Sequence, residues 1–141
     1  MSTEWSISLD YRMTSVSSYW GSIIHFTIGA TSGRLGDRTP ALFIRRDAEG
    51  FQFTTTLNDN DFYEYNNFEY VQVNRVYKIE IHQRYISNGN YRYFIKIDGD
   101  EVHSAINSKA RQFYNVKVYA GNPWDDASIG FISKLQFTNF L

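Results

Sequence analysis

With 141 residues the chain suits a single domain, residues 1–141, around one hydrophobic core. Its 14 basic and 15 acidic residues leave a net charge of −1, which argues against a general nucleic-acid binder and against an electrostatic membrane anchor. Cysteine is absent, which excludes disulfides and thiolate metal sites, and no apolar run approaches the roughly 20 residues needed to span a membrane.

Strand patterns separated by turns fill the N-terminal part of the chain. From Trp5 to Met13 apolar and polar residues alternate, which predicts a half-buried strand because successive side chains on a strand point to opposite faces. The apolar run Trp20–Ile28 predicts a central strand. Glycines and small polar residues make Gly29–Thr39 a long loop, of the kind that often carries function. Ala41–Arg46 and Phe51–Thr56 flank a short turn, which predicts a hairpin.

The middle of the chain holds the clearest pattern. Leu57–Asn67 is polar, acidic and aromatic, and we interpret it as a loop, while Phe68–Val73 predicts a strand. Two short turns, Asn88–Asn90 and Asp98–Asp100, break the alternation of residues 77–106. Asn, Asp and Gly tolerate the positive φ that tight hairpin turns require. This stretch therefore predicts a three-stranded antiparallel meander.

Two further strand patterns close the chain. Phe113–Ala120 predicts a strand, Gly121–Asp126 a turn, and Ile129–Asn139 the last strand. The first and last strands are both regular, and we expect them to pair or to lie close together. About ten strands without an amphipathic helix predict an all-β fold, an antiparallel sandwich or barrel.

Two segments of the sequence resemble laminin-G/concanavalin A-like domains. Val116–Phe137 looks like their closing hairpin, in which a strand, a turn rich in Asn, Asp and Pro, and a Gly-x-Ile-x-x-Leu strand complete a jelly roll. Val76–Asn107 is similar to the middle of these domains, where a hairpin ends in Ile-Asp-Gly. The resemblance implies a β-sandwich of the jelly-roll, concanavalin A-like type.

The same resemblance implies a lectin-like or adhesion module that binds carbohydrate or an extracellular protein, in some members with a calcium ion at one rim. The Glu-x-Asp-x-x-Glu motif of the β-glucan hydrolases in this group is absent here. Trp20–Ile23 lacks the Glu of the galectin Trp-Gly-x-Glu segment, and no His-x-Asn-x-Arg strand occurs. We therefore expect a lectin-like binding module that is not an enzyme. A structural or adhesion module that binds protein or itself, and a glycan-active enzyme with unrecognised carboxylates, are the alternatives.

Four acidic residues are candidate calcium ligands. Asp59 and Asp61 stand in the densest cluster of oxygen-bearing side chains, and Asp125 and Asp126 could join them from another loop at the same rim. Calcium takes six to eight oxygen ligands from carboxylates, amides and backbone carbonyls. The alternative is that these residues only make turns, as Asn and Asp often do.

Aromatic residues near the predicted loops are candidate carbohydrate ligands. A sugar stacks its apolar face on a ring while nearby polar groups bind its hydroxyls. The candidates are Tyr63, Tyr65, Asn66, Asn122 and Trp124. Trp20 and Phe62 belong to the same aromatic set, and the alternative is that the tryptophans cap the core and Phe62 packs the loop.

The remaining signals concern catalysis and compartment. His25, His82 and His103 have no spacing typical of a metal site or a catalytic triad. No signal peptide precedes the strand pattern that begins at Trp5, so the protein is either cytosolic or lacks its leader here. We expect an extracellular protein, because the resembling fold is commonest outside cells.

Overall fold

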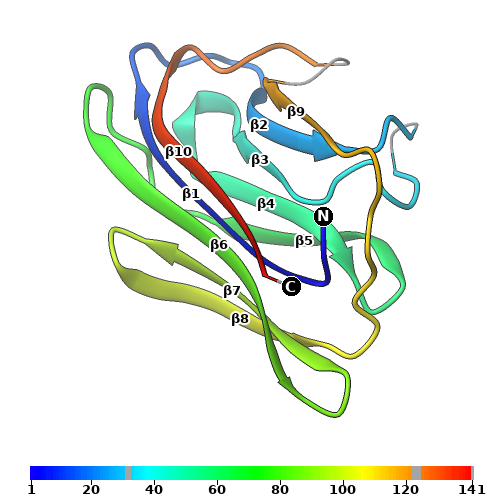
Figure 1. The fold of residues 1–141 in the computed structure, drawn as a ribbon. Helices are drawn as coiled ribbons and strands as arrows, with labels where there is room; N and C mark the ends of the chain where they lie inside the picture. The colour runs from blue at the N-terminus through cyan, green and yellow to red at the C-terminus, as the bar shows by residue number, and fades with distance from the viewer. Residues whose placement is uncertain (31–32, 122–124, 141) are drawn as a thin grey trace.

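A computed structural model describes residues 1–30, 33–121 and 125–140, which form ten strands (Figure 1). The only helical segment in these residues is a short 3₁₀ turn, Arg46–Ala48. The predicted all-β sandwich is therefore confirmed. No helix in this part of the chain is long and apolar enough to cross a membrane. The strands are β1 (Glu4–Met13), β2 (Gly21–Thr27), β3 (Ala41–Ile44), β4 (Phe51–Leu57), β5 (Asn60–Asn67), β6 (Val76–Ser87), β7 (Asn90–Ile97), β8 (Asp100–Asn107), β9 (Lys117–Ala120) and β10 (Gly130–Phe140).

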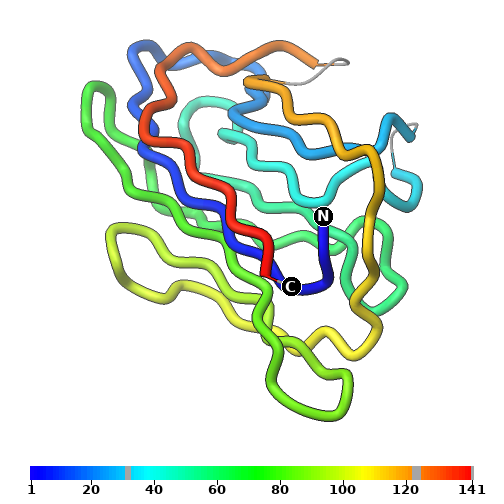
Figure 2. The backbone as a smooth tube through the Cα atoms, in the orientation of Figure 1, coloured from blue at the N-terminus to red at the C-terminus, as the bar shows by residue number. Residues whose placement is uncertain are grey.

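The strands form two antiparallel sheets of five strands each. The first sheet has the order β10-β1-β6-β7-β8, and the second has the order β5-β4-β3-β2-β9. The predicted pairing of the first and last strands is confirmed, since β1 and β10 run side by side (Figure 2). Their register sets Glu4 opposite Phe140. Strands β5 and β9 are the edges of the second sheet, and β8 and β10 are the edges of the first.

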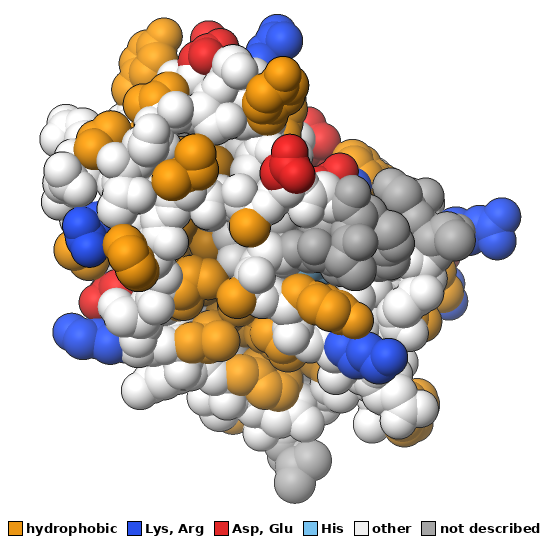
Figure 3. Space-filling model, turned by 90° about the horizontal axis from the view of Figure 1, so that it is seen from above, with side chains coloured by type: hydrophobic (Ala, Val, Ile, Leu, Met, Phe, Trp, Pro, Cys, Tyr) orange, Lys and Arg blue, Asp and Glu red, His pale blue; other side chains and the backbone are white. Residues whose placement is uncertain are grey.

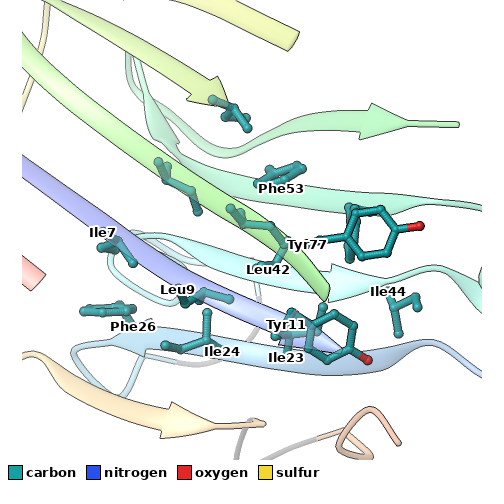
Figure 4. Packing of buried hydrophobic residues seen from close by; sticks show 14 of the residues in the cluster. Ile7, Leu9, Tyr11, Ile23, Ile24, Phe26, Leu42, Ile44, Phe53 and Tyr77 are labelled. Atoms are coloured by element: carbon teal, nitrogen blue, oxygen red, sulfur yellow. The ribbon is translucent and has the colours of Figure 1, made fainter. Parts of the chain in front are cut away.

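The core lies between the two sheets (Figure 4). Alternation on β1 buries every second residue, and edge-to-face ring contacts link the layers: Phe51 of β4 lies 5.4 Å from Tyr77 of β6, at 77°. Burial of one large apolar side chain stabilises a fold by about 1.5–3 kcal/mol, so the buried row of β1 alone favours stacking of the two sheets. The buried apolar residues of β1, β2, β3 and β4 include Trp5, Ile7, Leu9, Tyr11, Met13, Ile23, Ile24, Phe26, Leu42, Ile44, Phe51 and Phe53.

Tight turns join the meander as predicted. Asn88 and Gly89 have φ of 51° and 75°, and Asp98 and Gly99 have φ of 52° and 85°, values that suit two-residue hairpin loops. Residues 58 and 59 form a third turn of this kind between β4 and β5, with φ of 52° and 61°. The interpretation of Leu57–Asn67 as a loop is therefore wrong. The segment has only weak strand propensity, but its pairing with β4 makes it an edge strand.

Two other strand boundaries differ from the expected ones. No strand forms over Phe68–Val73, where only Val71 is buried and its amide donates to the carbonyl of Ala48 at 2.9 Å. The strand expected over Phe113–Ala120 is reduced to the four residues of β9, since only these pair with β2. Both differences arise because pairing partners, which local apolar patterns do not specify, decide where a strand exists.

Candidate ligand-binding site

A groove of about 480 Å³ lies on the outer face of the second sheet. Phe43 of β3 and Gln52 of β4 are cross-strand partners there, and they alternate with core residues, so their side chains point away from the core. Loops on either side complete the groove. Its lining residues are Tyr19, Trp20, Arg38, Phe43, Gln52, Phe62, Glu64, Asp125 and Asp126, and we call this set the outer groove.

Arg38 is held between two aromatic rings in the outer groove. Its guanidinium carbon lies 4.2 Å from the ring centre of Phe62 and 5.1 Å from that of Phe43. Cation–π contacts of this kind restrict the guanidinium to one orientation. Burial lowers the pKa of Arg38, while the carboxylates of Asp37, Asp125 and Glu64 act in the opposite direction. The side chain is therefore a fixed positive donor in a wall of the groove.

A buried polar network supports Arg38 from behind. Asp37 is almost fully buried, and its carboxylate accepts a hydrogen bond from the amide of Gly33 at 2.8 Å and lies 3.6 Å from Nε of Arg38. Nε2 of His25 lies 2.5 Å from the carbonyl oxygen of Asp37, and burial lowers the pKa of this histidine. Gly36 has a φ of 82°, and a Cβ there would come within 2.4 Å of Ile28. These contacts fix the described part of the loop 29–39 against the sheet.

A second arginine lies between rings near one end of the groove. The guanidinium carbon of Arg45 is 4.9 Å from the ring centre of Trp20 and 4.6 Å from that of Phe68. Its Nη1 donates to Oδ1 of Asn66 at 2.8 Å, and Nδ2 of Asn66 donates to Oε1 of Glu64 at 2.7 Å. Rings and oriented polar groups therefore alternate along this face, an arrangement that suits a ligand with both apolar and hydroxyl-bearing surfaces.

The structure separates the predicted carbohydrate ligands. Tyr63 and Tyr65 point inward from β5 and pack against the core, so they do not line the outer groove. Asn66 points outward and binds Arg45 next to the groove. Asn122 and Trp124 lie outside the described residues. Trp20, for which the alternative was a core cap, is partly exposed and lines the groove.

Sequence reasoning missed several residues of the groove, among them Arg38, Phe43 and Gln52. Gln52 has a signal, since it is the polar residue between Phe51 and Phe53 in a predicted strand. Arg38 has a weaker one, as a cation in a loop that was expected to carry function. Nothing in the sequence marks Phe43, whose outward position in an apolar strand follows only from the register with β4.

The four predicted calcium ligands are not gathered at one point. Asp59 binds Nζ of Lys109 and Nη2 of Arg111, both at 2.6 Å, and hydrogen bonds from these two cations lower its pKa. Asp61 shares the inner parity of β5, whereas Asp125 and Asp126 line the outer groove. Among the described residues, no three His, Cys, Asp or Glu side chains are arranged to hold a metal. Calcium binding stays a prediction, and a thermal shift with millimolar calcium tests it.

Apolar side chains are partly open on the side of the sandwich where the edge strands β9 and β10 lie. Val118, Leu135 and Phe137 are each nearly half exposed, although the ring of Phe137 lies 5.7 Å from that of the buried Phe26. A cavity of about 270 Å³ lies between Ala120 and the start of β10. Figure 3 shows hydrophobic side chains gathered in the middle of the face seen from above. We call Val118, Leu135 and Phe137 the apolar edge.

Comparison with known proteins supports the fold and not a family. No protein-family model matches the chain, and no curated protein is similar to it in sequence. Solved structures that are similar include a heptameric SAP-like pentraxin from Limulus polyphemus, with a TM-score of 0.55 and 10% identity over 96% of this chain and 63% of that chain. Ligand-free congerin I is similar with a TM-score of 0.52 and 11% identity, over 95% of this chain and 90% of that chain. The expected concanavalin A-like jelly roll is thereby confirmed.

Polysaccharide lyases share the fold. An endo-β-1,4-glucuronan lyase from Trichoderma reesei matches with a TM-score of 0.55 and 14% identity over 96% of this chain, which spans 57% of the lyase. Three alginate lyase structures match with 11 to 14% identity. The expectation that the chain is not an enzyme is therefore wrong, since it rested on the missing carboxylate motif of the β-glucan hydrolases. Enzymes of another kind, the polysaccharide lyases, occur on the same fold.

Proposed function

We propose that the chain binds carbohydrate in the outer groove as a lectin-like, extracellular module. One observation carries this proposal: Arg38 is fixed between the rings of Phe43 and Phe62 beside the amide of Gln52 and the carboxylate of Glu64. The apolar C–H face of a sugar ring stacks on an exposed aromatic ring, and its hydroxyls pair with donors and acceptors that are already oriented. Preorganised groups lose little freedom on binding, which favours affinity.

The groove offers both kinds of contact. Trp20 and Phe62 expose more than a third of their surface, whereas Phe43 is buried beneath Arg38. Gln52 and Glu64 supply an amide and a carboxylate for hydroxyls, and Arg38 supplies donors only. Presence of the same fold in a pentraxin and in congerin I supports the proposal, although at 10 to 11% identity it concerns the architecture alone.

A glycan array with a matched pair of variants tests the site. The array is read with calcium and with a chelator, because the calcium prediction concerns the same module. We expect binding by the wild type, at least a tenfold loss for Phe62→Ala, and unchanged binding for Phe131→Ala, which removes an exposed ring from the other sheet. Equal losses in both variants, or no binding to any glycan, would contradict the proposal.

A separate assay tests for catalysis with alginate and glucuronan, the polymers named in the similar lyases. Each polymer is incubated with the protein, and the ultraviolet absorbance of the unsaturated product is followed. Release of this product would assign lyase activity to the chain. Binding without release would assign a lectin.

Self-association is the second candidate, and the apolar edge favours it. Val118, Leu135 and Phe137 keep a large part of their surface exposed at two strands whose outer edges are unpaired in the described sheets. Contiguous apolar surface of this kind is typical of interfaces. Light scattering on wild type and on Leu135→Lys tests it: a dimer that the lysine dissociates supports the candidate, and a wild-type monomer at high concentration contradicts it.

A further inference from the structure

The edge strand β5 carries two different surfaces on its two faces. Phe62 and Glu64 point outward into the outer groove, whereas Tyr63 and Tyr65 between and after them point inward. Within the second sheet β5 is paired with β4 alone, because it is the edge. Whatever holds the inner face of β5 therefore also fixes Phe62 and Glu64 in the groove.

The inner face of β5 is held by His103 of β8. The hydroxyl of Tyr63 lies 2.7 Å from Nε2 of His103, and the ring of Tyr65 stacks on the imidazole at 4.3 Å and 11°. Strand β8 is the edge of the other sheet, so this histidine joins two edge strands across the opening of the sandwich. Tyr63 and His103 are 40 residues apart in the chain.

The surroundings of His103 favour the neutral imidazole. The groups that face it are the phenol rings of Tyr63 and Tyr65 from β5 and of Tyr93 from β7. Asp61 lies two residues before Tyr63 on the same face of β5. Glu101 of β8 is separated from His103 by a register shift and is paired with Arg92 of β7. Burial lowers the pKa of His103, and no carboxylate offsets this effect.

We propose that His103 is a positioning residue for the outer groove, and that protonation of its imidazole in acid loosens β5 and releases the ligand. The inference rests on the proposed carbohydrate site and adds that pH regulates binding there. We assign the neutral ring to the tautomer with its proton on Nδ1, in which Nε2 offers its lone pair to the hydroxyl of Tyr63 at 2.7 Å. A doubly protonated ring has no lone pair, so the hydroxyl proton loses its acceptor at a partly buried position.

The direction of the effect follows from linkage. A histidine whose pKa is lower in the folded state binds a proton more readily when its surroundings open, so acid favours the open state. The effect begins as the pH falls below about 6.5, the ordinary pKa of histidine, and grows as the pH falls further. At neutral pH the contact is intact and Phe62 and Glu64 keep their places.

Amide hydrogen exchange of β5 tests the contact without any ligand. Protection factors, which remove the intrinsic effect of pH on exchange, are compared at about pH 7.5 and about pH 5, on either side of the ordinary histidine pKa. We expect the protection of β5 in the wild type to fall several-fold in acid. His103→Phe keeps a ring for Tyr65 to stack on and does not titrate, so β5 should respond no more than β4 does.

His82→Gln is the matched control. Burial also lowers the pKa of His82, but this residue stacks on Phe94 on the outer face of the first sheet and does not touch β5. This variant should keep the wild-type response of β5. A wild-type β5 whose protection does not change with pH would overturn the inference, as would an undiminished change in His103→Phe.

The glycan array, read at the same two pH values, separates this inference from the proposed function. Binding at pH 7.5 that weakens in acid for the wild type and for His82→Gln, but not for His103→Phe, supports both. Absence of binding at pH 7.5 contradicts the carbohydrate site, and hydrogen exchange then still decides whether His103 controls β5. Binding that responds to pH equally in all three proteins contradicts the role of His103 alone.

Discussion

The guanidinium carbon of Arg38 lies 4.2 Å from the ring centre of Phe62, and this contact joins the described part of the loop 29–39 to the edge strand β5. Arg38 comes from the loop before β3 and Phe62 comes from β5, and each restricts the other. Arg38 is held on its other side by Phe43, which belongs to the sheet itself. The loop and the edge strand are therefore held together across the outer groove by one guanidinium group that lies between two rings.

Replacement of Phe62 by Leu removes the ring but keeps most of the apolar volume. We expect a loss of about 0.5–1 kcal/mol in the free energy of unfolding, the range of a partly exposed cation–π contact. Phe131→Leu is the matched control, since the guanidinium carbon of Arg12 lies 5.1 Å from that ring on the other sheet. Urea denaturation measures both, and glycan binding should weaken only in Phe62→Leu. An equal loss of glycan binding in Phe131→Leu would contradict a specific role of Phe62 in the outer groove.

Asp37 is almost fully buried beneath the loop 29–39, so its negative charge should contribute to the stability of the fold. Asp37→Asn keeps an oxygen for the amide of Gly33 but removes the negative charge beside Arg38 and His25. A buried group left without its charge partner costs about 1–3 kcal/mol. We expect a loss of this size by urea denaturation and a larger one for Asp37→Ala. Equal stability of wild type and Asp37→Asn would show that the carboxylate acts only as a hydrogen-bond acceptor.

Asp59 ties the β4–β5 turn to the segment that follows β8, through Lys109 and Arg111. The pKa of Asp59 is lowered in the folded state, so its contribution to stability is present above the ordinary carboxyl pKa of about 3.9 and is lost as the pH falls through the folded value. We expect Asp59→Asn to lower the melting temperature slightly at neutral pH. The difference from wild type should shrink with added salt and vanish once the pH is below the folded-state pKa of Asp59, because an exposed pair is screened and a protonated one is absent. A difference that persists in strong acid would point to turn geometry, since Asp59 has a positive φ.

Much of the fold could be predicted because its signals are local. Alternation from Trp5 to Met13 and the turn at Asn88–Gly89 each depend on a few neighbouring residues, and the structure contains both features. Strand β5 was missed because its many Asn, Asp and Glu residues are typical of loops. They hide the alternation between inward-pointing tyrosines and outward-pointing side chains. Its existence depends on pairing with β4, which the turn at residues 58 and 59 imposes.

The site was harder to predict, because its residues come from separate strands and loops. Trp20, Arg38 and Gln52 meet only once the order of the second sheet is known, and periodicity says nothing of that order. Tyr63 was predicted as a ligand-binding residue, but its side chain points inward and its partner His103 lies on the other sheet. Long-range packing decides which edge strands of the two sheets face each other. The sequence therefore could not show whether Tyr63 contacts a ligand or another part of the fold.

Tyr93 offers a test of the core beside that contact. Its side chain is fully buried, its hydroxyl has no hydrogen-bond partner within the described part of the chain, and burial raises its pKa. A buried polar group without a partner costs about 1–3 kcal/mol, and removal of that group can stabilise a protein. We therefore expect Tyr93→Phe to match or exceed the wild type in its free energy of unfolding. Tyr63→Phe is the contrasting variant, since it removes the hydroxyl that binds His103 and should destabilise by about 1 kcal/mol. Urea denaturation compares the two. A destabilised Tyr93→Phe would show that the buried hydroxyl has a bound water as partner, while an unaffected Tyr63→Phe would show that stacking of Tyr65 alone holds β5.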